Sequence, residues 1–232
     1  MNTKVNIAGI EFKNPVMTAS GTFGSGMEYS EFVDLNALGA VVTKGVANVP
    51  WPGNPTPRVA EVYGGMLNAI GLQNPGIDVF IERDIPFLKQ YDTKIIVNVC
   101  GKTIKEYLEV VERLADTDVD MLEINVSCPN VKEGAIAFGQ KADCLSEITS
   151  AIKKVAKQPI IMKLSPNVTD ITEMAMAAEA AGGRGGRRGR HFPDQHPDGH
   201  ENRHQPPHLR PCQQNRRHVR PGHQTCSRPY GL

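Results

Sequence analysis

The sequence predicts an α/β protein, a (β/α)8 TIM barrel that is truncated after about five strand–helix units. Short apolar segments alternate with stretches that have the period of an amphipathic helix, from about residue 15 to residue 182. The apolar segments are apolar throughout, as expected for a parallel sheet that is covered on both faces. Polar residues follow several of these segments directly, which is how a barrel builds an active site.

Five strand–helix units are expected in order. The predicted strands span 15–20, 40–46, 94–100, 121–129 and 159–166. The predicted helices span 28–35, 77–90, 103–116, 143–156 and 170–182. A long loop is expected over 50–76, where Pro and Gly are frequent and interrupt regular structure.

Polar side chains stand at the carboxyl ends of five different predicted strands. They are Ser20, Lys44, Asn98, Asn125 and Lys163. The carboxyl ends of barrel strands meet at one face, so these side chains are expected to converge. No GxGxxG string follows the first strand, which disfavours the dinucleotide-binding alternative among doubly wound folds.

The composition divides the chain at about residue 182. All lysines lie at or before Lys163, all histidines lie at or after His191, and Ile and Met are absent after residue 182. Such a segment cannot bury enough apolar surface to offset its chain entropy. We therefore expect an incomplete barrel domain over 1–182 and a basic tail over 183–232 that is disordered or out of frame.

Several classes of protein are disfavoured by the same sequence. No CxxC string occurs, so neither a zinc site nor an iron–sulfur site is expected, and no metal is predicted. The unpaired cysteines suit a reducing compartment, and no apolar run of about 18 residues could span a membrane. The start lacks the apolar core of a signal peptide, so a cytoplasmic location is expected. The tail has few aromatic residues, which disfavours specific nucleic-acid binding.

Four strings carry the candidate chemistry. In NVSCPN (125–130), Cys128 closes a strand between two asparagines, and a thiol of lowered pKa can act as a general base. In NAIGLQNPG (68–76), glycines allow a ligand to approach the backbone closely. TKG (43–45) and MKLSPN (162–167) each place a lysine at a strand end, where two cations could stabilise one anion.

Together with SGTFG (20–24) and GNPTPRV (53–59), these strings resemble the dihydroorotate dehydrogenases, over residues 5–181. A cysteine at position 128 is typical of class 1 enzymes, since class 2 enzymes use serine. The stretch from GNPTPRV to NAIGLQNPG is closest to type B. The resemblance implies a flavoprotein oxidoreductase of pyrimidine (UMP) synthesis that oxidises dihydroorotate to orotate with FMN as hydride acceptor.

The resemblance also implies roles for individual residues. Cys128 would be the catalytic base that removes a proton from carbon 5 of the substrate. The FMN-binding residues would be Ser20, Lys44, Gly45, Asn98, Asn125 and Lys163. The residues that bind dihydroorotate would be Lys44, Asn68, Ala69, Ile70, Gly71, Leu72 and Asn125.

A partner is implied as well. Type B enzymes pass electrons to NAD through an electron-transfer subunit that carries FAD and an iron–sulfur cluster. The expected assembly is a heterotetramer of two catalytic and two electron-transfer chains. No NAD-binding motif occurs in this chain, which agrees with that division of labour.

Two alternatives stay open. The chain could be an inactive, truncated fragment of that enzyme, or another FMN barrel such as a dihydropyrimidine dehydrogenase domain. The family continues after AAEAAG (177–182) with a strand that bears asparagine and threonine, and later with glycine-rich phosphate loops. Neither can be found here, so we hypothesise that the coding frame is shifted from about residue 183.

Overall fold

The computed structural model describes residues 2–127, 138–182 and 190–192. The chain divides into two compact units. The first comprises Met1–Asn54 with Gly71–Gly199, and the second comprises Pro55–Ile70 with His200–Leu232.

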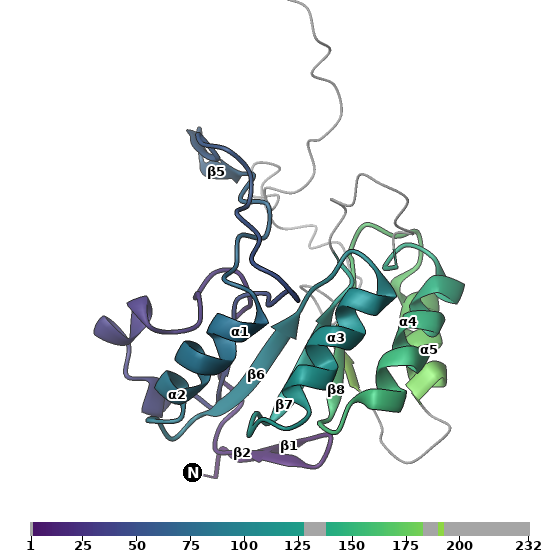
Figure 1. Ribbon diagram of the computed structural model, residues 1–232, viewed down its shortest axis with the longest axis horizontal. Coiled ribbons are helices and arrows are strands. Elements are labelled where there is room, and N and C mark those ends of the chain that lie inside the picture. Colours follow the sequence, from purple (N-terminus) through teal and green to yellow (C-terminus); the bar gives the residue numbers. More distant parts are fainter. Residues whose placement is uncertain (1, 128–137, 183–189, 193–232) are drawn as a thin grey trace, which may run out of the picture. The chain divides into compact units, whose positions relative to one another are not determined.

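The first unit is built on a parallel sheet of five strands (Figure 1). Their spatial order follows the chain: β3 (Ala40–Val42), β6 (Lys94–Val99), β7 (Met121–Asn125), β8 (Ile160–Lys163) and β9 (Arg190–Phe192). Every neighbouring pair is parallel. A doubly wound sheet reverses its strand order at one point, whereas a barrel adds each strand beside the previous one. The observed order is that of a partial (β/α)8 barrel, as predicted, but β9 lies within 183–232, where the sequence predicts a disordered or out-of-frame tail.

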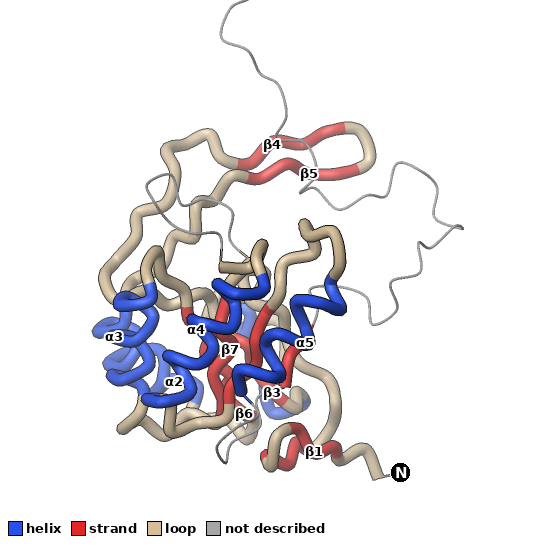
Figure 2. Tube along the Cα trace, turned by 90° about the vertical axis from the view of Figure 1, so that its right-hand side faces the viewer, coloured by secondary structure: helices blue, strands red, loops and turns tan. Residues whose placement is uncertain are grey.

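Helices lie along one face of this sheet (Figure 2). They are α1 (Ile77–Val79), the π-helical turn η3 (Phe80–Asp84), α2 (Ile85–Leu88), α3 (Ile104–Leu114), α4 (Ala142–Val155) and α5 (Ile171–Gly182). Thr103 caps α3, because its side chain accepts a hydrogen bond from the Glu106 backbone N–H at 3.2 Å. The last three predicted helices are confirmed to within two residues at each end.

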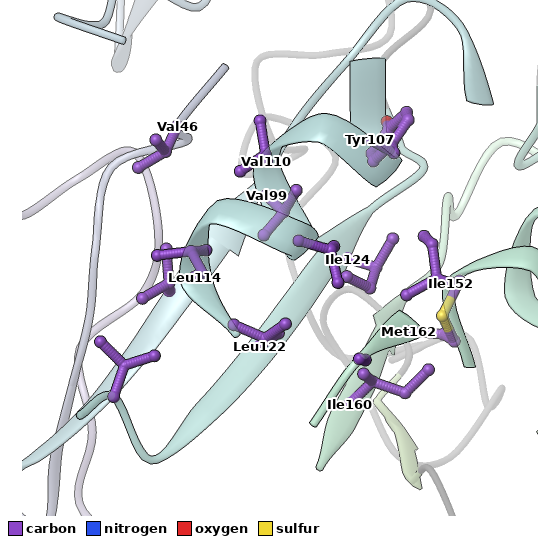
Figure 3. Packing of buried hydrophobic residues seen from close by; sticks show 14 of the residues in the cluster. Val46, Val99, Tyr107, Val110, Leu114, Leu122, Ile124, Ile152, Ile160 and Met162 are labelled. Carbon is purple, nitrogen blue, oxygen red and sulfur yellow. The ribbon is translucent and has the colours of Figure 1, made fainter. Parts of the chain in front are cut away.

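The main core lies between these helices and the sheet (Figure 3). Alternate strand residues, such as Val97, Leu122 and Ile160, are fully buried against the apolar faces of the helices. From α3, Val111 and Leu114 enter this core, as the apolar period of the helix predicts. This packing fixes which strand residues point away from the helices.

The opposite face of the sheet has a core of its own. The first two strands, β1 (Val5–Ile7) and β2 (Ile10–Phe12), form an antiparallel hairpin that the sequence reading missed. Phe12 of this hairpin is fully buried in a second cluster, with residues from four strands of the parallel sheet. Those residues are Ala40, Val42, Ile96, Met121 and Ile161. The far ends of the same strands are left for polar side chains.

Two predictions about the first strand–helix unit are wrong. Residues 15–20 form no strand, and only an isolated bridge joins Met17 to Ala40. Residues 28–35 form no α-helix but two short 3-10 turns, η1 (Glu28–Glu31) and η2 (Leu35–Ala37). The Asp34 side chain accepts from the Asn36 backbone N–H at 2.9 Å, which starts a new turn and ends the first.

The predicted helix at 77–90 is present but irregular, because its middle turn is π-helical. Pro86 stands in the following turn and has no N–H to continue the ladder of hydrogen bonds, which accounts for the change of register.

The predicted loop 50–76 contains a hairpin in the second unit, formed by β4 (Val59–Val62) and β5 (Gly65–Asn68). All eight of its strand residues are exposed.

Candidate functional site

The polar side chains predicted to converge lie on the face of the sheet opposite the helices. Side chains alternate between faces along a strand, so a strand residue shares its face with the residue two positions earlier. Asn98 follows Ile96 in this way, and Lys163 follows Ile161. The hairpin therefore fills this face at the amino ends of the strands, and polar groups occupy it at the carboxyl ends.

Asn98 is the centre of the polar group. Its side chain is 1% exposed, and its Nδ2 donates to Glu123 Oε1 at 2.6 Å and to Ser20 Oγ at 3.3 Å. Its Oδ1 accepts from Asn125 Nδ2 at 3.4 Å. Because a carboxylate only accepts hydrogen bonds, Glu123 determines which end of the Asn98 amide carries the nitrogen.

Asn125 connects this group to the next strand. Its Oδ1 accepts from Ser127 Oγ at 2.7 Å, and that hydroxyl in turn accepts from Lys163 Nζ at 3.2 Å. Its backbone carbonyl accepts from the Tyr107 hydroxyl of α3 at 2.6 Å. The carboxyl ends of β6, β7 and β8 are thus joined by side-chain hydrogen bonds.

Lys44 and Gly45 follow β3 and lie beside the same group. A β-carbon on Gly45 would lie 2.9 Å from Asn98 Oδ1 and 3.2 Å from Cys100 Sγ, so only glycine fits between them. The Lys44 backbone N–H donates to the Gly24 carbonyl at 2.8 Å. A β-carbon on Gly21 would lie 3.9 Å from Lys44 Nζ. SGTFG and TKG are therefore in contact, and their two strings form one edge of the site.

The predicted substrate segment 68–72 is divided between the two units. Gly71 and Leu72 belong to the first unit, and both have positive φ, at 76° and 54°. Asn68 ends β5 in the second unit, followed by Ala69 and Ile70. The Ala69 N–H donates to the Arg58 carbonyl at 2.8 Å, which continues the hairpin pairing.

Cys128, the predicted catalytic base, lies outside the residues that the structure describes. Within the described ranges, no cluster of three or more His, Cys, Asp or Glu side chains is arranged to hold a metal ion. Within those same ranges, no helix has the length and apolar character needed to cross a membrane.

Three further residues complete this polar group and were not predicted from the sequence: Tyr107, Glu123 and Ser127. The apolar period of its helix accounts for the Tyr107 ring and gives no indication of the partner of its hydroxyl. Glu123 interrupts an otherwise apolar strand, and that interruption was the available signal. An acidic residue inside a buried strand requires a partner, and the register Asn98↔Glu123 supplies one.

The sequence and the fold both match those of known proteins. The family model for dihydroorotate dehydrogenase matches residues 2–185. The chain belongs to the dihydroorotate dehydrogenase family. Relatives of high identity are named dihydroorotate dehydrogenase B (NAD(+)), catalytic subunit. The chain is 74% identical over 178 residues to the one from Lachnoclostridium phytofermentans and 69% identical over 178 residues to the one from Alkaliphilus metalliredigens. The class 1, type B resemblance of the motifs is confirmed.

These alignments cover 77% of this chain and 59% of each of the two relatives. A solved structure of the dihydroorotate dehydrogenase of Eimeria tenella in complex with ferulenol has the same fold, with a TM-score of 0.64 at 22% identity. That match covers 78% of this chain and 57% of the solved one. The chain thus spans somewhat more than half the length of the family members that it matches.

Proposed function

We propose that this chain derives from the catalytic subunit of a type B dihydroorotate dehydrogenase, which oxidises dihydroorotate to orotate with FMN as hydride acceptor. The supporting observation is the polar group at the carboxyl ends of β6, β7 and β8, in a member of this family. Barrel enzymes place their active sites at this end of the strands.

The residues present fit a flavin. Gly45 packs directly against Asn98 Oδ1 and Cys100 Sγ, which brings the backbone that follows β3 close to the polar group. The donor set combines asparagine amides with the ammonium groups of Lys44 and Lys163, and suits a ring that has carbonyl acceptors and gains negative charge. We infer that Ser20, Lys44, Gly45, Asn98, Asn125 and Lys163 hold FMN.

The reaction removes two hydrogens from neighbouring carbons of dihydroorotate. The Cys128 thiolate takes the proton from carbon 5, and the electron pair of that bond forms the new double bond to carbon 6. FMN supplies the redox chemistry when bound, since it accepts the hydride that leaves carbon 6. Asn125 and the segment Asn68, Ala69, Ile70, Gly71 and Leu72, with Lys44, orient the ring of the substrate.

The relatives' names support a partner subunit, because they designate a catalytic subunit and name NAD. We propose that the partner carries FAD and an iron–sulfur cluster and passes electrons to NAD, in a heterotetramer of two chains of each kind. A cytoplasmic location belongs to the same proposal.

The tail lies almost entirely outside the family match, which ends at residue 185. We infer that residues 183–232 are translated out of frame. Consider the frame in which each codon takes the last two bases of one tail codon and the first base of the next. In this frame, the codon that spans Asp194 and Gln195 encodes Ile or Thr. The next codon, across Gln195 and His196, encodes Asn or Ser, and the one across His196 and Pro197 encodes Ile or Thr. This matches the strand bearing asparagine and threonine that the family has after residue 182.

The same displaced frame restores the residue types that the tail lacks. Glu201–Asn202 and Gln214–Asn215 each give Lys or Arg, and His218–Val219 gives Met or Thr. No pair of tail residues forces a stop codon in this frame. The coding sequence decides the matter: we expect the displaced frame to stay open past codon 232 and to extend the family match. A stop codon within it would refute the inference.

The experiment for the function compares two proteins, the 232-residue chain and the chain with its frame restored. We expect the restored protein to be yellow, with the absorbance of bound flavin, and to oxidise dihydroorotate. We expect the 232-residue chain to bind FMN weakly or not at all, because the family's phosphate loops lie beyond the part that it shares with its relatives. Bound flavin together with oxidation of dihydrouracil instead of dihydroorotate would favour the dihydropyrimidine dehydrogenase alternative. Absence of flavin from the restored protein would contradict the proposal.

A further inference from the structure

Asn74 closes the long excursion of the chain between β3 and α1. The excursion leaves the fold near Ala47 and returns near Gly76, and Asn74 bonds to both ends. Its side chain is 6% exposed, and its Oδ1 accepts from the Ala47 N–H at 3.1 Å and from the Gly76 N–H at 3.0 Å. The backbones of Asn74 and Trp51 also exchange two hydrogen bonds, at 3.0 and 3.1 Å.

The nitrogen end of the same amide holds Leu72. Nδ2 donates to the Leu72 carbonyl at 2.9 Å, and Leu72 has a φ of 54°, which is unfavourable for a residue with a β-carbon. Beside it, a β-carbon on Gly71 would lie 2.7 Å from the Asn54 nitrogen. The backbone at residues 71–72 is therefore closely packed. A hydrogen bond from the Asn74 side chain holds Leu72, which has the less favourable backbone conformation.

Only an asparagine satisfies all these groups at once. Two N–H groups require an acceptor and one carbonyl requires a donor, so a single orientation of the amide serves all three. An aspartate of the same shape would accept from both N–H groups but could not donate to Leu72. An alanine would leave all three groups without this partner.

We propose that Asn74 is a positioning residue, which sets the backbone of Gly71 and Leu72 for contact with the substrate. The substrate contact itself rests on the proposed function. The closure by Asn74 rests on contacts within the first unit alone. The closure can therefore be tested on the 232-residue chain, and the substrate contact on the protein with its frame restored.

The first test measures closure by hydrogen exchange at the Ala47 and Gly76 amides in the wild type, Asn74→Asp and Asn74→Ala. Asn74→Asp should keep both amides protected, whereas Asn74→Ala should raise their exchange rates by roughly tenfold or more. Asn6→Asp is the matched control, because Asn6 Oδ1 also accepts a backbone N–H, that of Gly9 at 3.1 Å, in the β1–β2 turn. Unchanged exchange in Asn74→Ala would refute the closure. If Asn74→Ala does not fold, the role of Asn74 is decided by the melting temperature of Asn74→Asp in the second test.

The second test asks whether Asn74 supports the strained Leu72. Asn74→Asp should lower the melting temperature, and the loss should be smaller in a Leu72→Gly background, because glycine adopts positive φ without strain. An equal loss in both backgrounds would overturn the positioning of Leu72.

The third test addresses the substrate, by titrating orotate into the protein with its frame restored while the NMR signals of Gly71 and Leu72 are observed. Asn74→Asp should weaken binding by roughly tenfold relative to this parent, and Asn6→Asp should leave it unchanged. Unchanged affinity in Asn74→Asp would refute the link to the substrate. If the parent binds no orotate, the proposed function fails, while the first two tests still decide the closure.

Discussion

The Asn98 amide and the Glu123 carboxylate face each other across β6 and β7, 2.6 Å apart. This pair fixes the orientation of the amide in the middle of the polar group, since the carboxylate can meet only its nitrogen. The oxygen of Asn98 is thereby directed toward Asn125 and Gly45. An acidic side chain that is not itself a predicted ligand thus determines how one of the predicted ligands, Asn98, is oriented.

Replacement of Glu123 by Gln should destabilise the fold by about 1 kcal/mol, because a hydrogen bond to a charged acceptor becomes one between neutral groups. Urea unfolding measures the change. The side-chain amide signals of Asn98 should also move, since its partner has changed. The matched control is Glu112→Gln, at an exposed position of α3, which should change neither quantity. Wild-type stability in Glu123→Gln would show that this pair does not hold the amide.

Tyr107 of α3 holds the carboxyl end of β7 from the helix side of the sheet. Its side chain is 2% exposed, and its hydroxyl donates to the Asn125 carbonyl at 2.6 Å. Tyr107→Phe keeps the ring and removes this donor, so we expect a loss of about 1 kcal/mol in the free energy of unfolding. Tyr63→Phe is the control, because Tyr63 is fully exposed and its hydroxyl can bond to water in either state. Equal effects of the two substitutions would argue against an anchoring role.

Replacement of Cys128 tests the proposed base in the protein with its frame restored. Cys128→Ala should lower turnover of dihydroorotate by about 10²–10⁴-fold while flavin stays bound, because a positioned general base contributes a factor of that order. Cys128→Ser should retain more activity than Cys128→Ala, since a hydroxyl serves as the base in class 2 enzymes. Turnover within about threefold of the parent in the alanine variant would exclude Cys128 as the base.

The convergence of the site could be predicted from the sequence, because parallel strands bring their carboxyl ends to one edge whatever the details of packing. Asn98, Asn125 and Lys163 meet there for that reason. The partner of Glu123 could not be predicted, since it depends on the register between β6 and β7, which pairs residues 25 positions apart in the sequence.

The elements missed by the sequence reading are short. Strands β1 and β2 have three residues each, and the residues of β4 and β5 are exposed, so neither pair shows the apolar run that is typical of a buried strand. The closure at Asn74 was missed for a different reason. It joins residues that are 27 positions apart, and only the fold brings Ala47 and Asn74 together.

Gly45 provides the sharpest steric test of the site. A β-carbon there would lie 2.9 Å from Asn98 Oδ1 and 3.2 Å from Cys100 Sγ, and both neighbours are buried in or directly after β6. Gly45→Ala should therefore destabilise the fold by about 1–3 kcal/mol, the usual cost of overpacking. Gly65→Ala is the matched control, since the nearest atom to its new β-carbon would be 3.9 Å away.

A double substitution distinguishes the steric contributions of Asn98 and Cys100, the two neighbours of Gly45. Cys100→Ala removes the sulfur but leaves Asn98 in place, so it should restore only part of the stability that Gly45→Ala loses. Full restoration would mean that the sulfur alone excludes a side chain at position 45. In that case, contact with Asn98 would not be what requires glycine at this position.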